Sequence, residues 1–561
     1  VQVATQVFPL FHIAEWVLRW IVVAAVVGFP FAIAFAWFFE WTPQGLRRES
    51  KVAPAESITH QTGKKLDRWI IAVLAAAVVL LLTDRFVLHK DATAISDKSI
   101  AVLPLVNESG DQDQQFFSDG LSENFIVALS QFSGLKVIGR NSSFQFRDAK
   151  YDSRSIGEKL GVATLLEGSV QRAGGAVRIS AELIRAADGS TIWTQRYDRP
   201  YKDLFALQDD ITQSVAGALK TKLLTNDTAA TQTDRPPSGN LDAYSAYLQG
   251  KFYFARSTEA DWRKALEYYA SATRIDSRYA LAWVGSSHAR GWLAAQYLGG
   301  AEAQQVNAQA RSDLDTALKL EPNLAAAHMV RGELLGALDF DWSGSEAELR
   351  RALQLEPNNS DALENLGVVF ATLGRPEPAI QLIQQSLVTD PLRPGGFMLL
   401  ARLFMSLGHL DEAEQSIRKA IALQPASGIF DATLAVIEVQ RGDANAALAA
   451  AEQAVPGIWQ DYALGMARQI GNDRVAADAA LKLAIDNDAD GMAFQIAQMQ
   501  ALRRDPDQTF AWLDRALANR DPGLQFLLVD RFLLRYQSDP RFAVFCKKMG
   551  LPATTTAKAL P

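Results

Sequence analysis

The feature that most constrains this chain is a pattern written twice at a spacing of 34 residues between positions 361 and 425. Six positions recur with nearly the same chemistry. They are Leu366, Gly367, Phe370, Ala379, Ile383 and Pro391 in the first copy, and Leu400, Ala401, Phe404, Ala413, Ile417 and Pro425 in the second. A period of this length is typical of a helix-turn-helix unit, which must stack on copies of itself because one unit cannot bury its own apolar stripe. The sequence therefore predicts an all-α solenoid.

The period and the residue pattern are those of the tetratricopeptide repeat, abbreviated TPR. Small residues such as Gly367 and Ala413 allow the two helices of a unit to pack closely, and Phe370 fills the space between neighbouring units. Weaker copies on both sides extend the array to about eight units over residues 241–522, with an insertion near Tyr297. Residues 523–561 are expected to form capping helices and a tail.

The resemblance to TPR proteins implies a concave groove lined by the first helix of each unit. Transferring the groove positions of that family to this sequence gives the expected partner-binding residues Met329, Glu333, Glu364, Asn365, Met398 and Arg402. Such a groove receives an extended or helical peptide, and methionine offers adaptable apolar contact. Glu364 departs from the Lys and Asn of the carboxylate clamp, so chaperone C-terminus capture is not expected. The alternative is that these residues belong to solvated faces.

Two apolar stretches predict transmembrane helices at about residues 16–41 and 69–88, within a membrane anchor over residues 1–97. The run 21–39 carries no charged residue, and a helix of this length nearly crosses a bilayer core of roughly 30 Å. Buried helices of a soluble core are the alternative. Because the chain opens at Val1 inside an apolar stretch, we also expect a segment upstream of it.

The loop between the two stretches is basic. Its cations are Arg47, Arg48, Lys51, Lys64, Lys65 and Arg68. The positive-inside bias places such a loop in the cytoplasm. This predicts a protein of the bacterial inner membrane, with the C-terminal domains in the periplasm if the source is Gram-negative. A basic loop without topological meaning is the alternative.

Residues 98–224 predict a small α/β domain, which a linker at 225–240 separates from the array. Short apolar runs between turn residues predict strands. They lie at 99–105, 135–138, 163–170, 177–184 and 192–197. Apolar residues at helical spacing predict helices. They lie at 115–132, 153–160 and 204–224.

The run SIAVLPLVNESGDQDQQFFSDGLSENFIVALSQFSGLKVIGRNSSFQF (99–146), with LLEGSVQRAGGAVRISAELIRAADGSTIWTQRYDR (165–199), resembles the TolB N-terminal-like, or FlgO-like, domain. The resemblance implies a bacterial membrane protein in which this domain precedes TPR units. In that family a class III nucleotide cyclase or a winged-helix DNA-binding domain often precedes the anchor. Neither sequence occurs in these 561 residues.

The composition offers little catalytic chemistry. The net charge of −7 argues against nucleic acid as a partner. A single cysteine, Cys546, cannot form an internal disulfide, and the six histidines are scattered without the spacing of a metal site. The sequence contains no P-loop, so we expect no nucleotide cofactor. The sequence therefore predicts a non-catalytic, membrane-anchored scaffold or sensor that binds protein partners of the envelope. The alternative is the sensory half of a signalling protein whose cyclase or winged-helix effector lies upstream. A hydrolytic α/β domain is a third hypothesis.

Overall fold

The computed structural model describes residues 39–42, 45–48, 95–132, 134–147, 151–219, 234–471, 473–552, 554–557 and 559. The chain divides into two compact units, Val1–Ala94 and Ile95–Pro561. In the first unit, strand β1 (Phe39–Thr42) pairs antiparallel with strand β2 (Gly45–Arg48). All other elements described below belong to the second unit.

The transmembrane part of the predicted fold class is wrong for the described residues. Within the ranges given above, no helix is both long and apolar enough to cross a membrane. At the end of the first expected span, residues 39–41 lie in β1, because their backbone pairs with strand β2 instead of continuing a helix. The rest of the stretch 16–41 and the whole of 69–88 lie outside the described residues.

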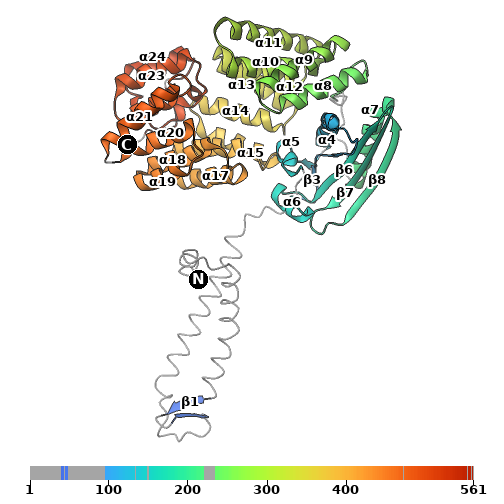
Figure 1. The fold of residues 1–561 in the computed structure, drawn as a ribbon, viewed down its shortest axis with the longest axis horizontal. Coiled ribbons are helices and arrows are strands. Elements are labelled where there is room, and N and C mark those ends of the chain that lie inside the picture. Colours follow the sequence, from blue (N-terminus) through green and yellow to red (C-terminus); the bar gives the residue numbers. More distant parts are fainter. Residues whose placement is uncertain are drawn as a thin grey trace. The chain divides into compact units, whose positions relative to one another are not determined.

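A small α/β domain opens the second unit (Figure 1). Its strands are β3 (Ser99–Val102), β4 (Val106–Asn107), β5 (Lys136–Val137), β6 (Thr164–Ala173), β7 (Ala176–Arg185) and β8 (Thr191–Pro200). Its helices are α4 (Gln115–Ser130), α5 (Arg140–Ser143), α6 (Ser153–Leu160) and α7 (Leu204–Ala218). The strand order is β5-β3-β6-β7-β8, with β4 also on β6. β3 runs parallel to β5 and β6, while β6, β7 and β8 form an antiparallel meander.

The alternation of side chains along β3 gives this sheet two buried faces. Ile100 and Val102 belong to the apolar cluster that contains residues of α4 and α7. Ala101 and Leu103 belong to a second cluster with residues of α6. The domain is therefore a sheet with α4 and α7 on one face and α6 on the other.

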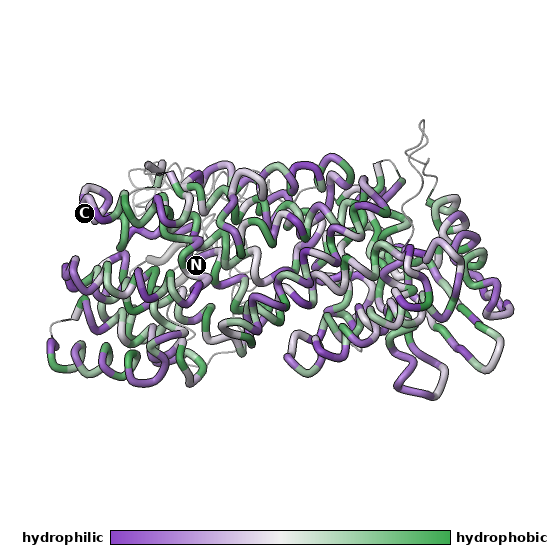
Figure 2. Tube along the Cα trace, turned by 90° about the horizontal axis from the view of Figure 1, so that it is seen from above, coloured by the Kyte–Doolittle hydropathy of each residue, from purple (hydrophilic) through white to green (hydrophobic). Residues whose placement is uncertain are grey.

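The helical array follows, and its sixteen described helices form eight consecutive pairs. The first helices of the pairs are α8 (Leu241–Phe254), α10 (Ala280–Tyr297), α12 (Ala325–Asp339), α14 (Ser360–Thr372), α16 (Pro394–Leu407), α18 (Gly428–Arg441), α20 (Ile458–Ile470) and α22 (Ala493–Leu502). The second helices are α9 (Glu259–Ile275), α11 (Gly300–Leu320), α13 (Trp342–Leu355), α15 (Pro376–Thr389), α17 (Leu410–Leu423), α19 (Ala444–Gln453), α21 (Arg474–Asp488) and α23 (Pro506–Ala518). Hydrophobic and hydrophilic residues are interspersed along these helices (Figure 2), as amphipathic helices require.

The sequence period corresponds to repeated backbone geometry. Gly374, Gly408 and Gly442 follow the first helices at intervals of 34 residues and have φ angles of 70°, 81° and 80°, which favour glycine. Inside a unit, a Cβ added to Gly367 would lie 2.7 Å from Cδ1 of Ile383. The glycine thus allows α14 and α15 to approach closely. The predicted small α/β domain followed by an all-α solenoid is confirmed.

The α/β domain packs on the array at two places, the first of which is α8. One apolar cluster runs from the sheet through α4 into α8, α9 and α10. A Cβ added to Gly120 of α4 would lie 2.6 Å from Leu248 of α8. Beside this contact, the Glu123 carboxylate pairs with both Lys251 and Arg140. Although burial alone would raise the pKa of Glu123, these cations lower it to about 2.

The second place is the loop between α15 and α16. The Asp390 carboxylate, which is 0% exposed, accepts hydrogen bonds from the Ser142 backbone N–H at 2.8 Å and the Asn141 side-chain amide at 3.0 Å. The Ser142 hydroxyl donates a third bond to it. The backbone N–H of Gly139 donates to the Thr389 carbonyl at 2.7 Å. Segments about 250 residues apart are thus joined by buried hydrogen bonds.

Candidate functional site

The six groove residues expected from the sequence lie on three consecutive first helices. Met329 and Glu333 are on α12, Glu364 and Asn365 on α14, and Met398 and Arg402 on α16. All six are partly buried. We call the face formed by the first helices the inner face of the array. The groove positions transferred from TPR proteins thus fall on first helices.

Glu333 connects three first helices of the inner face. Its Oε2 lies 2.9 Å from Nε2 of His288 on α10, and its Oε1 accepts a hydrogen bond from the Asn365 side-chain amide. Burial would lower the pKa of His288, but the Glu333 carboxylate outweighs that effect and raises it. His288 was not among the predicted residues, because one histidine without paired spacing gives no signal in the sequence.

The Glu364 carboxylate already forms an ion pair with an arginine of its own chain. Nε of Arg393 lies 2.7 Å from Oε2 of Glu364, and Arg393 also pairs with Asp361. Burial raises the pKa of Glu364, and the nearby guanidinium only partly opposes this rise. For Arg393, the two carboxylates raise the pKa although burial would lower it. Glu364 and Arg393 therefore stabilise the junction of α14 and α16 and are already partnered.

The inner face also carries a segment from the C-terminal end of the chain. This segment begins with the 3-10 helix η7 (Pro522–Val529) and continues through η8 (Leu534–Tyr536) to α24 (Pro540–Lys548). η7 contacts α14, α16 and α22. Val529 is buried in one apolar cluster with Leu399 and Leu403, and the guanidinium carbon of Arg402 lies 4.8 Å from the centre of the Phe526 ring.

Further contacts hold this segment against the middle of the array. Nη1 of Arg520 donates to the Leu338 carbonyl at 2.6 Å, and the Trp342 indole N–H donates to the Met549 carbonyl at 2.8 Å. The Thr555 hydroxyl lies 2.9 Å from the Gly374 carbonyl oxygen. The C-terminal residues, expected to form capping helices and a tail, therefore reach back to α12, α13 and the residue Gly374 after α14. No local pattern in the sequence signals contacts of such long range.

Two family models match parts of the chain. One is described as the second domain of HilA/YgeH-like transcriptional regulators and matches residues 96–214, which form the α/β domain. The other is a tetratricopeptide repeat and matches residues 341–395 and 398–463. Among the described residues, no group of three or more His, Cys, Asp or Glu side chains is arranged to hold a metal ion.

Two curated proteins show sequence similarity. The Putative adenylate cyclase 3 of Rhizobium meliloti (strain 1021) is 32% identical over 320 residues, which cover 57% of this chain and 42% of that protein. The Cellulose synthase operon protein C of Xanthomonas axonopodis pv. citri (strain 306) is 30% identical over 162 residues, covering 28% of this chain and 11% of that protein. The chain thus spans less than half the length of these curated relatives.

Among solved structures, the type IV pilus biogenesis factor PilW is 22% identical, with a TM-score of 0.33, and the match covers 38% of this chain and 92% of PilW. At this level the match concerns the repeat fold alone. The chain contains tetratricopeptide repeats, and they follow an α/β domain similar to the second domain of HilA/YgeH-like transcriptional regulators.

Proposed function

We propose that this chain is a non-catalytic protein-interaction module whose inner face binds a segment of a partner protein. One observation carries the proposal: the inner face already holds an apolar peptide segment, η7, through Val529 and Phe526. A surface that packs on such a segment in cis has the chemistry to bind a similar one in trans. The proposed partner-binding residues are Met329, Glu333, Asn365, Met398 and Arg402; Glu364, predicted with them, is already paired with Arg393.

Photo-crosslinking tests this proposal. A photoreactive residue replaces Met398 on the inner face in one version of the full chain, and in the control it replaces Val475, which is 81% exposed on α21. In extracts of the source organism, we expect Met398 to yield a defined polypeptide adduct that Val475 does not yield. A synthetic peptide from the crosslinked region should compete. Identical products from both positions, or none from Met398, would contradict the proposal.

A second candidate is the sensory half of a signalling protein, in which the inner face controls an effector outside this chain. It is favoured by the match to part of the Putative adenylate cyclase 3 and by the match of residues 96–214 to a transcriptional-regulator domain. The reading frame upstream of Val1 tests it. A cyclase or winged-helix sequence there would support this function, and an in-frame stop codon without such a sequence would refute it.

The resemblance to the TolB N-terminal-like domain and the location in the bacterial envelope stay predictions from the sequence. Alkaline phosphatase fused after Lys98 tests the location, because this enzyme is active only outside the cytoplasm. An active fusion would support the periplasmic location. Activity of a cytoplasmic reporter alone at the same position would contradict it.

A further inference from the structure

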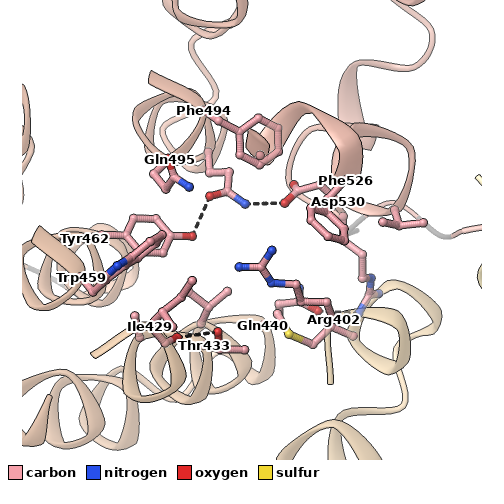
Figure 3. A pocket seen from close by; sticks show the side chains of 17 residues that line it. Arg402, Ile429, Thr433, Gln440, Trp459, Tyr462, Phe494, Gln495, Phe526 and Asp530 are labelled. Carbon is pink, nitrogen blue, oxygen red and sulfur yellow. Dashed lines mark hydrogen bonds between the residues drawn. The ribbon is translucent and has the colours of Figure 1, made fainter. Parts of the chain in front are cut away.

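A small pocket lies on the inner face between α16, α18, α20, α22 and the C-terminal segment (Figure 3). Its volume is about 70 Å³, which is room for a few water molecules or a small organic molecule. Apolar and aromatic side chains form much of its wall, including Ile429, Trp459, Phe494 and Phe526. Polar side chains also line the pocket. Some of them are hydrogen-bonded to one another, and others have no hydrogen-bond partner among the described residues.

Three of these polar groups satisfy one another. The Tyr462 hydroxyl donates to Oε1 of Gln498 at 2.7 Å, and Nε2 of Gln498 donates to the Asp530 carboxylate. Asp530 also accepts the backbone N–H groups of Phe532 and Leu533, each at 3.0 Å. This chain of bonds fixes the Asp530 carboxylate at the pocket wall without the help of Arg402.

Arg402 has no such partner. Its guanidinium enters the pocket from α16 above the Phe526 ring. Among the described residues, none forms a hydrogen bond or ion pair with it, although Asp530 is near enough to interact electrostatically. Burial lowers the pKa of Arg402. A partly buried guanidinium with unused N–H donors is costly in free energy and is a ready site for a carboxylate.

Gln495 supplies a second, independent unpaired group. This residue of α22 is 9% exposed and lines the same pocket. Its Oε1 is buried and accepts no hydrogen bond. Buried side-chain polar atoms almost always have a partner, so this acceptor is available to a donor on a ligand in the pocket.

The pocket thus combines the Arg402 guanidinium without an acceptor, the Gln495 oxygen without a donor and the fixed Asp530 carboxylate. Its walls are largely apolar. We propose that it binds an α-amino acid with a small apolar side chain, whose α-carboxylate pairs with Arg402 and whose α-nitrogen donates to Gln495 and faces Asp530. The side chain of the ligand lies against the aromatic wall. Arg402 also belongs to the proposed partner-binding residues, but the pocket goes beyond the proposed function, because its ligand is a free small molecule.

Calorimetry on the full chain tests the proposal with three probes. L-valine is the free amino acid, acetyl-glycyl-valine presents the same carboxylate and an adjacent N–H as a peptide terminus, and valine methyl ester lacks the carboxylate. We expect saturable binding of L-valine and none of the ester. Binding of acetyl-glycyl-valine alone would keep the α-carboxylate chemistry and assign it to a peptide terminus. If neither carboxylate probe saturates the protein at about 20 mM, which corresponds to roughly −2 kcal/mol, the proposal fails.

Variants place the binding in this pocket. Arg402→Met and Gln495→Leu should each weaken L-valine binding roughly tenfold or more, since each removes one ligand hydrogen bond. Arg418→Met is the matched control, because Arg418 is an exposed arginine of α17 outside the pocket. Circular dichroism and the melting temperature verify that each variant is folded. Unchanged L-valine affinity in folded Arg402→Met would overturn the assignment, even if the wild-type chain binds L-valine.

Discussion

Replacing Asp390 with alanine tests how firmly the α/β domain is joined to the helical array. The substitution removes three hydrogen bonds from Asn141 and Ser142 and leaves the backbone N–H of Ser142, a residue that is 0% exposed, without an acceptor. Hydrogen bonds to a charged acceptor contribute about 1.5–3 kcal/mol each and are not fully additive. We therefore expect the free energy of unfolding to fall by about 3–5 kcal/mol.

Urea unfolding followed by circular dichroism gives the change in stability, and hydrogen exchange at the Ser142 amide locates it. Asp443→Ala is the control, because Asp443 makes one capping bond at an exposed helix start, to the Ala446 N–H at 2.9 Å. Loss of such a cap costs about 1 kcal/mol. If Asp390→Ala costs no more than this control and the Ser142 amide stays protected, the buried junction does not contribute as the structure implies.

Three further predictions concern groups elsewhere in the second unit. Burial raises the pKa of Asp234 from 3.8 to about 6. Because the folded state then binds this proton more tightly than the unfolded state, the free energy of unfolding should fall by about 2 kcal/mol as the pH rises from 4 to 6. Asp234→Asn should remove that fall in urea titrations at each pH. Gly120→Ala should lower the free energy of unfolding by about 1–3 kcal/mol, because the added Cβ would clash with Leu248. Gly217 has open space where a Cβ would lie, so Gly217→Ala should not lower it. Cys546 is 1% exposed, and burial raises its pKa to about 11, so a thiol reagent should label it only after unfolding.

The repeat architecture was predictable because its determinants are local. The spacing of Gly367 and Ala401 sets the helix contacts inside each unit, and glycines such as Gly408 end the first helices. The positions transferred from TPR proteins placed Met329, Glu364 and Arg402 on first helices of their units, as the structure has them. By contrast, the predicted helix 16–41 is wrong at its described end, since residues 39–41 pair as a strand.

Only the tertiary structure decided what lies on that face. The sequence could not show that Glu364 is paired with Arg393, that Arg402 stacks on Phe526, or that Asp390 binds Ser142. These contacts join segments that are distant along the chain or that follow no common period, so no local pattern encodes them. The sequence alone determined that an α/β domain precedes a solenoid of helix pairs. Both follow from local patterns: the apolar spacing of the strands and helices in the domain, and the 34-residue period in the array. Among the described residues, only the tertiary packing decided which charged groups are ion-paired, such as Glu364, and which, such as Arg402, are not.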